Sequence, residues 1–193
     1  MKKEKVKKLV SFFYEIGTLR KVLRSHQQTL LVFDPTDNIA AHSFRTAFIG
    51  YFLAKELGAD ANKVIKMCLL HDIEESRVGD QNWVHKRYIK IFEEQIRKEQ
   101  LSNLSKELLK LSEEYQERKT LEAKIAKDAD LLDQILLLRE YELEGSKEAK
   151  KWLKEGPHVK MMHTKLAKEI AKEIKKQRPS LWWEKIWTPN RRK

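Results

Sequence analysis

The segment Leu69–Asp80, LLHDIEESRVGD, carries side chains that can bind a metal ion and transfer protons. His71 and Asp72 are adjacent at the end of an apolar run, and Glu75 follows shortly after. On a helix the first two would lie about 100° apart, so both could reach one ion at the helix margin. Glu75, one turn further on, could face the ion without binding it. The segment therefore predicts a metal site with a proton-transfer group beside it.

A histidine and an aspartate on other expected helices would complete such a site. His42 lies in the first turn of the preceding helix, and Asp130 lies in a strongly apolar helix later in the chain. Helices packed side by side can bring such groups to one ion, as carboxylate bundles do. Nitrogen and carboxylate ligands together suit Mn, Fe, Co, Ni or Zn better than Ca. We therefore expect a divalent transition metal between core helices.

Other charged residues near these positions allow alternative roles. Asp128 and Asp133 share the apolar segment of Asp130 and are either surface acids or partners that orient a ligand histidine. Glu74 would point elsewhere on its helix, and we expect it to be a solvated charge. Arg45 lies one turn after the first histidine and is expected to pair with an acid near the site. His158 and His163 flank a Gly-Pro break without a ligand context, so we interpret them as structural.

The elements that must position these residues are expected to be helices. Glycine and proline are few, with six and four in 193 residues, and apolar residues recur at helical spacing. The expected helices cover residues 5–14, 39–57, 60–75, 83–99, 103–115, 120–143 and 159–176. The broad apolar face of the second is expected to contain Phe44, Ala47, Phe48, Tyr51, Phe52 and Ala54. We predict an all-α, single-domain bundle over residues 1–178, followed by a tail over 179–193.

Composition narrows the class of protein. The net charge of +11, from 40 basic and 29 acidic residues, is compatible with nucleic-acid binding, with anionic substrates or with a lysine-rich surface. Lysine and glutamate alternate along the helices, which favours the solvated surface. One cysteine, Cys68, excludes a disulfide within the chain, and no apolar run approaches about 18 residues. We expect a soluble, cytoplasmic protein without membrane association.

The tail SLWWEKIWTPNRRK combines tryptophans with basic residues. Trp182, Trp183 and Trp187 could stack on nucleic-acid bases or lie at a membrane surface. We favour packing on the domain or against a second subunit, with the tryptophans and Ile186 buried.

Three motifs in order, NIAAHSFRTA, CLLHDIEESRVGD and LEAKIAKDADLLDQ, resemble those of the HD-domain metal-dependent phosphohydrolases, in particular the 5′-deoxynucleotidase branch. The resemblance covers roughly Ile16 to Leu143. It implies an all-α fold, a homodimer and one metal ion. The implied ligands are His42, His71, Asp72 and Asp130.

The resemblance also implies roles for residues around the metal. Glu75 would assist the attacking water, Asp80 would contact the sugar and Arg24 the phosphate. The predicted activity is metal-dependent hydrolysis of nucleoside or deoxynucleoside 5′-monophosphates. Alternatives are a phosphodiesterase or nucleoside-triphosphate hydrolase on the same metal site, or a nucleic-acid-binding module with a structural metal.

Overall fold

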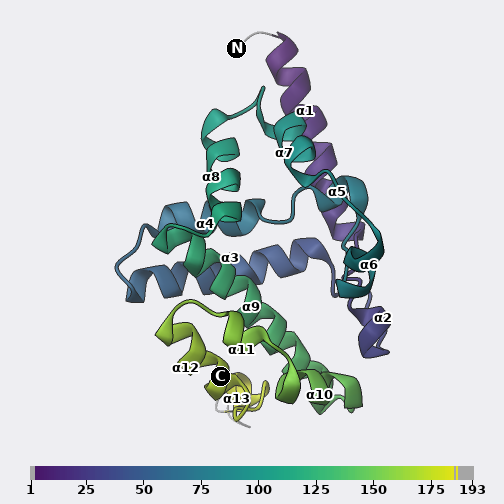
Figure 1. Ribbon diagram of the computed structural model, residues 1–193, viewed down its shortest axis with the longest axis vertical. Helices are drawn as coiled ribbons and strands as arrows, with labels where there is room; N and C mark the ends of the chain where they lie inside the picture. The colour runs from purple at the N-terminus through teal and green to yellow at the C-terminus, as the bar shows by residue number, and fades with distance from the viewer. Residues whose placement is uncertain (1–2, 185, 187–193) are drawn as a thin grey trace, which may run out of the picture.

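The protein is an assembly of helices, as the sequence predicts. The structure, a computed structural model, describes residues 3–184 and 186 (Figure 1). In chain order the elements are α1 (Lys3–Gly17), the 3-10 helix η1 (Thr18–Lys21), α2 (Gln27–Leu30), α3 (Ile39–Glu56), α4 (Ala61–Leu70), α5 (Glu75–Val78), α6 (Trp83–Tyr88), α7 (Glu93–Leu101), α8 (Lys106–Glu117), α9 (Leu121–Leu143), α10 (Lys147–Glu155), α11 (His158–Met161), α12 (Lys165–Ile174) and α13 (Leu181–Glu184). An isolated antiparallel bridge joins Leu23 to Asn38.

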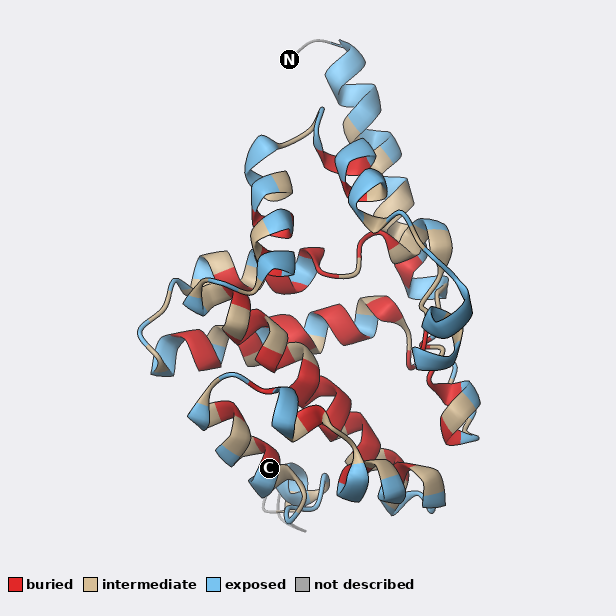
Figure 2. Cartoon of the chain, viewed as in Figure 1, coloured by how far each residue is buried: buried red, intermediate tan, exposed pale blue. Residues whose placement is uncertain are grey.

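Helix α9 is the centre of the bundle. It packs against α3, α4, α8, α10 and α12. Its apolar residues Ile125, Leu132, Ile135 and Leu138 are almost wholly buried, and Figure 2 shows buried residues along most of its length while α1 projects into solvent. Burial of such side chains from several helices stabilises the bundle by roughly 1.5–3 kcal/mol each. The helices that carry the candidate ligands therefore share one core.

Capping side chains fix the beginnings of three of these helices. Asn38, Asp60 and Thr120 each accept a hydrogen bond at 3.1–3.2 Å from the backbone amide three residues further on. Such a cap satisfies an amide that has no partner inside the helix and is worth about 1 kcal/mol. The predicted starts of α3, α4 and α9 are thereby confirmed.

The expected helix over residues 60–75 is wrong at its C-terminal end. Helix α4 ends at Leu70, and a turn precedes α5. In a continuing helix the carbonyl of Cys68 would accept the amide of Asp72. That carbonyl instead lies 2.6 Å from Nδ1 of His71. The side chain of His71 thus helps to end the helix and releases Asp72 from helical geometry.

Three other expected helices also differ from the structure. Residues 83–99 form α6 and α7, because the apolar Tyr88, Ile89 and Phe92 are exposed and give no core contact to hold a continuous helix. The helix expected from residue 103 begins at 106, after the capping Ser105. Residues 159–176 form α11 and α12, because Asp128 binds the chain between them.

The face of α3 turned to the core is only partly the one expected: Ala47 and Ala54 are buried as predicted, but the phenylalanines are not. Phe44, Phe48 and Phe52 are 65%, 55% and 62% exposed. The buried face includes His42, Thr46, Gly50 and Leu53. This face is opposite the phenylalanines, because a shift of two residues along a helix corresponds to a rotation of about 200°. A Cβ at Gly50 would lie 2.8 Å from Sγ of Cys68, so α3 and α4 approach closely there.

The described part of the tail is not buried on its own domain, and the expected packing against a second subunit stays a prediction. Trp182 is 75% exposed, and Trp183 and Ile186 are 42% and 39% exposed in the single chain. Trp187 lies outside the described residues. The domain boundary between residues 178 and 179 stays a prediction. Among the described helices, none has the length and apolar character needed to span a lipid bilayer.

Candidate metal centre and active site

The four expected metal ligands converge from α3, from the turn after α4 and from α9. The Nε2 atoms of His42 and His71 are 3.0 Å apart. Oδ2 of Asp72 lies 3.1 Å from Nε2 of His71 and 3.5 Å from that of His42. Oδ1 of Asp130 lies 3.3 Å and 3.9 Å from the Nε2 atoms of His42 and His71. The ligand atoms of His42, His71 and Asp72 all lie within 4.8 Å of one another, and Oδ1 of Asp130 lies beside the two imidazoles.

Hydrogen bonds on the far side of each ring fix the histidine tautomers. Nδ1 of His71 faces the carbonyl oxygen of Cys68, which can only accept a hydrogen bond, so this nitrogen carries the proton. Nδ1 of His42 faces Oδ2 of Asp133 at 2.6 Å and donates to that carboxylate. When both rings are neutral, as metal ligation requires, both Nε2 atoms present lone pairs to the space between them. Such an arrangement fits a cation between them.

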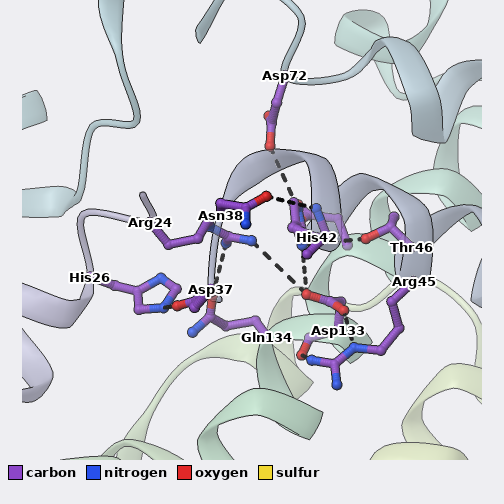
Figure 3. A network of polar contacts seen from close by, with 12 residues as sticks. Arg24, His26, Asp37, Asn38, His42, Arg45, Thr46, Asp72, Asp133 and Gln134 are labelled. Atoms are coloured by element: carbon purple, nitrogen blue, oxygen red, sulfur yellow. Dashed lines mark hydrogen bonds and ion pairs between the residues drawn. The ribbon is translucent and has the colours of Figure 1, made fainter. Parts of the chain in front are cut away.

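Asp133 is itself held in place. Its other oxygen accepts a hydrogen bond from Nε of Arg45 at 2.5 Å, and Arg45 also binds Glu140 at 2.8 Å. Figure 3 shows His42 between Asp72 on one side and Asp133 on the other. Asp133 is thus the aspartate that orients His42, and the expected pairing of Arg45 with an acid near the site is confirmed.

The electrostatics of the centre favour positive charge. Burial and the charge of Arg24 lower the pKa of His42, but hydrogen bonds to two carboxylates outweigh them and raise it to about 9. Burial raises the pKa of Asp72, but the charge and hydrogen bond of His71 and the charge of His42 hold it below its ordinary value. Carboxylates that stay ionised beside imidazoles are a donor set suited to a divalent ion.

A cavity of about 310 Å³ opens onto this centre. Its walls include three of the expected ligands, His71, Asp72 and Asp130. The predicted substrate and proton-transfer residues, Arg24, Glu75 and Asp80, also line it. All the predicted site residues except His42 therefore line one cavity. His42 is buried beside it.

Arg24 has donor capacity left over. Its Nη2 donates to Oε1 of Gln134 at 3.1 Å, while Nε and Nη1 meet no hydrogen-bond partner in the described part of the chain. The nearest carboxylate oxygens, on Asp80 and Asp133, are 3.8 Å and 4.0 Å away. Leaving buried charged donors unpaired is costly, so these atoms fit an anionic group in the cavity.

The residues that follow Arg24 hold its loop. Ser25 donates from its amide and its hydroxyl to Oδ2 of Asp80, at 2.6 Å and 3.0 Å. Nε2 of His26 lies 2.8 Å from Oδ2 of Asp37. Asp80 thus binds the Arg24 loop in addition to lining the cavity, which places it close to any ligand that Arg24 binds.

Glu75 begins α5 and faces the cavity. Its Oε2 is buried without a hydrogen-bond partner among the described residues. Burial, with the negative charges of Asp72 and Asp80, raises its pKa to about 11. A group poised to hold a proton beside the ligands is a candidate general acid or base, and a bound cation would make it easier to ionise.

Three acidic residues make contacts that the sequence analysis did not predict. Glu74 is buried and pairs with Arg97 at 2.8 Å, so the prediction of a solvated charge is wrong: the turn after α4 points it at α7. Asp128 is wholly buried and accepts hydrogen bonds at the start of α12. Oδ2 of Asp130 is held by Lys127 at 2.6 Å, a partner that the i,i+3 spacing could have indicated.

The cavity also has an aromatic wall that the sequence did not reveal. Trp83, Trp152 and His158 come from α6, α10 and α11 and all line the cavity. The ring of Trp83 stacks on that of Trp152 at 5.7 Å and 17°, and on that of His158 at 6.1 Å and 19°. Their sequence positions carry no common pattern, because only the tertiary fold brings them together.

Comparison with known proteins agrees with this arrangement. The sequence pattern of the HD domain family matches residues 16–176. The 5′-deoxynucleotidase HDDC2 of Dictyostelium discoideum is 32% identical over 148 residues, which cover 69% of this chain and 77% of that protein. Human 5′-deoxynucleotidase HDDC2 is 29% identical over 142 residues, covering 69% of this chain and 68% of the human protein.

Solved structures give the same result. A conserved hypothetical protein from Pyrococcus furiosus superposes with a TM-score of 0.70 and 28% identity, covering 87% of this chain and 99% of that one. The resemblance stated from the three motifs is thus confirmed. With its helical bundle and the match over residues 16–176, this chain belongs to the HD domain family.

Proposed function

We propose that this protein is a metal-dependent phosphohydrolase that converts nucleoside and deoxynucleoside 5′-monophosphates to nucleoside and phosphate. The observation that carries the proposal is the convergence of two imidazole lone pairs with two carboxylates beside a buried arginine that has unpaired donors. The relatives named 5′-deoxynucleotidases support the substrate class.

We assign the metal to His42, His71, Asp72 and Asp130. When bound, a divalent cation there polarises the phosphoryl group and makes a water molecule acidic near neutral pH. Nitrogen and oxygen ligands together accept Mn, Co, Ni, Fe or Zn, and availability decides among these ions. The hydrogen bonds from Nδ1 of both rings hold the histidines in the ligand orientation before any ion arrives.

The other cavity residues have distinct tasks in the proposed reaction. Arg24 binds the phosphate through Nε and Nη1, which neutralises charge and positions the phosphorus. Glu75 takes a proton from the attacking water and can deliver one to the leaving 5′ oxygen. Asp80, which already holds the Arg24 loop, accepts a hydrogen bond from the sugar.

The test is phosphate release from a panel of ribo- and deoxyribonucleoside 5′-monophosphates. Metal-stripped protein is supplied in turn with Mn, Co, Ni, Zn or Mg, beside the variants Asp72→Ala and Glu169→Ala. Glu169 lies on α12 with its side chain 57% exposed, and its replacement controls for loss of a carboxylate away from the cavity. We expect metal-dependent phosphate release from the wild type and from Glu169→Ala, and none from Asp72→Ala.

Absence of release from metal-loaded protein with every monophosphate would overturn the proposal. Diesters, triphosphates and polynucleotides would then be the substrates to examine. A polynucleotide complex that weakens steeply with salt would favour the nucleic-acid-binding alternative, because phosphate contacts release counterions.

We further propose that the protein forms a homodimer. The exposed row Phe44, Phe48 and Phe52 on α3 supports a partner surface, since exposed apolar patches mark interaction sites. Light scattering is expected to give twice the mass of one chain for the wild type and the single mass for Phe48→Lys. Cytoplasmic residence remains a prediction from the single cysteine.

A further inference from the structure

The aromatic wall of the cavity has a feature that core packing does not explain. Trp83 is 56% exposed although it stacks on two other rings. Helix α6, which it begins, has no buried residue. Trp83 is therefore not filling the core. Two neighbouring rings hold the indole of Trp83 in place, and more than half of its surface stays exposed. This arrangement is typical of a surface that binds a ligand.

The two supporting rings are better anchored. His158 is buried, and Trp152 is packed against the hydrophobic core of the bundle. The planes of Trp152 and His158 lie 17° and 19° from that of Trp83, and the two rings are tilted by 32° to each other at 6.3 Å. Trp83 is therefore stacked on two neighbouring rings. Aromatic rings in this arrangement prefer to stack further flat rings with an offset.

Unpaired polar groups that line the same cavity restrict what can bind. Arg24 leaves Nε and Nη1 unpaired, and Gln134, which is 9% exposed, leaves Nε2 without a partner in the described part of the chain. Both residues line the cavity with Trp83. A ligand that satisfies both the unpaired donors and the aromatic wall combines an anionic group with a flat ring system.

We propose that Trp83, supported by Trp152 and His158, is the platform on which the nucleobase of the substrate stacks. The inference rests on the proposed function, which it deepens by assigning a base-binding subsite. Every nucleobase has a flat π-face, so the platform tolerates several bases but selects against phosphomonoesters without a base. Phosphate and metal contacts alone would not make that selection.

Binding of a nucleoside without phosphate tests the platform apart from catalysis. Deoxyadenosine is titrated into the metal-free protein, and its dissociation constant is measured by ligand-observed NMR. Trp83→Ala is expected to weaken binding on the order of 5- to 100-fold, the range of base–aromatic stacking, and Trp83→Phe to recover part of the loss. Trp182→Ala is the matched control, because Trp182 is a 75% exposed tryptophan outside the cavity lining.

Kinetics with two substrates provide the second measurement. For Trp83→Ala, kcat/KM is expected to fall for deoxyadenosine 5′-monophosphate and to stay unchanged for 2-deoxyribose 5-phosphate. Equal loss for both substrates, or deoxyadenosine binding that is unaffected by Trp83→Ala, would overturn the inference. Trp83-dependent nucleoside binding without any phosphate release would uphold the platform while refuting the proposed function.

Discussion

Replacement of Asp133 by asparagine tests how the fold prepares the metal centre. Oδ2 of Asp133 accepts the Nδ1–H of His42 at 2.6 Å, and Oδ1 accepts from Arg45 at 2.5 Å. An amide oxygen can still accept from His42, but the charge that fixes the tautomer and strengthens the ligand is lost. Removing such a partner typically lowers metal affinity about 10- to 100-fold, which corresponds to about 1.4–2.7 kcal/mol.

The assay is competition between the metal-stripped protein and a chelator of known affinity for Mn or Co. Glu140→Gln is the control, because it removes the other carboxylate of Arg45, at 2.8 Å, and leaves the contact between Asp133 and His42 intact. Its metal affinity is expected to equal that of the wild type. Thermal unfolding of both metal-free variants establishes that they fold. Unchanged affinity in folded Asp133→Asn, or equal losses in both variants, would refute the reasoning.

Three further predictions address proton transfer, packing and pH. Glu75→Gln is expected to lower kcat on the order of 10²- to 10⁴-fold while metal affinity is retained; a similar kcat would exclude Glu75 as the proton-transfer group. Gly50→Ala is expected to lower the free energy of unfolding by about 1–3 kcal/mol in urea titrations, because its Cβ would lie 2.8 Å from Sγ of the buried Cys68; an unchanged value would mean that α3 and α4 can separate freely. Burial lowers the pKa of His158 below its ordinary value of 6.5, so the stability that depends on its neutral form is present above pH 6.5 and lost as the pH falls through the folded-state pKa. Metal-free wild type is therefore expected to lose more thermal stability than His158→Phe between pH 7.5 and 5.5, and parallel losses would count against this assignment.

The sequence predicted helix bounds well where a side chain caps the helix in which it lies. Thr120 and the apolar spacing that follows it define α9 almost to the residue, since cap and periodicity agree. The prediction failed where tertiary contacts determine the end of a helix. The helix over 60–75 stops at Leu70 because the ring of His71 takes a helix carbonyl, and residues 159–176 divide because Asp128 binds the chain from α9.

For the candidate site, too, the sequence predicted some features and not others. The order and context of the three motifs predicted which residues meet, and the structure places all four expected ligands around one point. Helical periodicity could not distinguish Asp130 from Asp133, which are one turn apart. Their roles depend on which ring nitrogen of His42 each carboxylate approaches: Nε2 for Asp130 and Nδ1 for Asp133. The aromatic wall around Trp83 had no sequence signal, since α6 is far along the chain from the consecutive helices α10 and α11.

We propose that one metal ion held by His42, His71, Asp72 and Asp130 drives hydrolysis of nucleoside 5′-monophosphates. The most direct measurement titrates Mn or Co into metal-stripped protein and follows bound metal and phosphate release from deoxyadenosine 5′-monophosphate in the same samples. Bound metal and phosphate release are expected to rise together, to saturate at a single ion per chain and to be lost together in Asp72→Ala. Phosphate release that is independent of bound metal, or tight metal binding that survives in Asp72→Ala, would contradict this proposal.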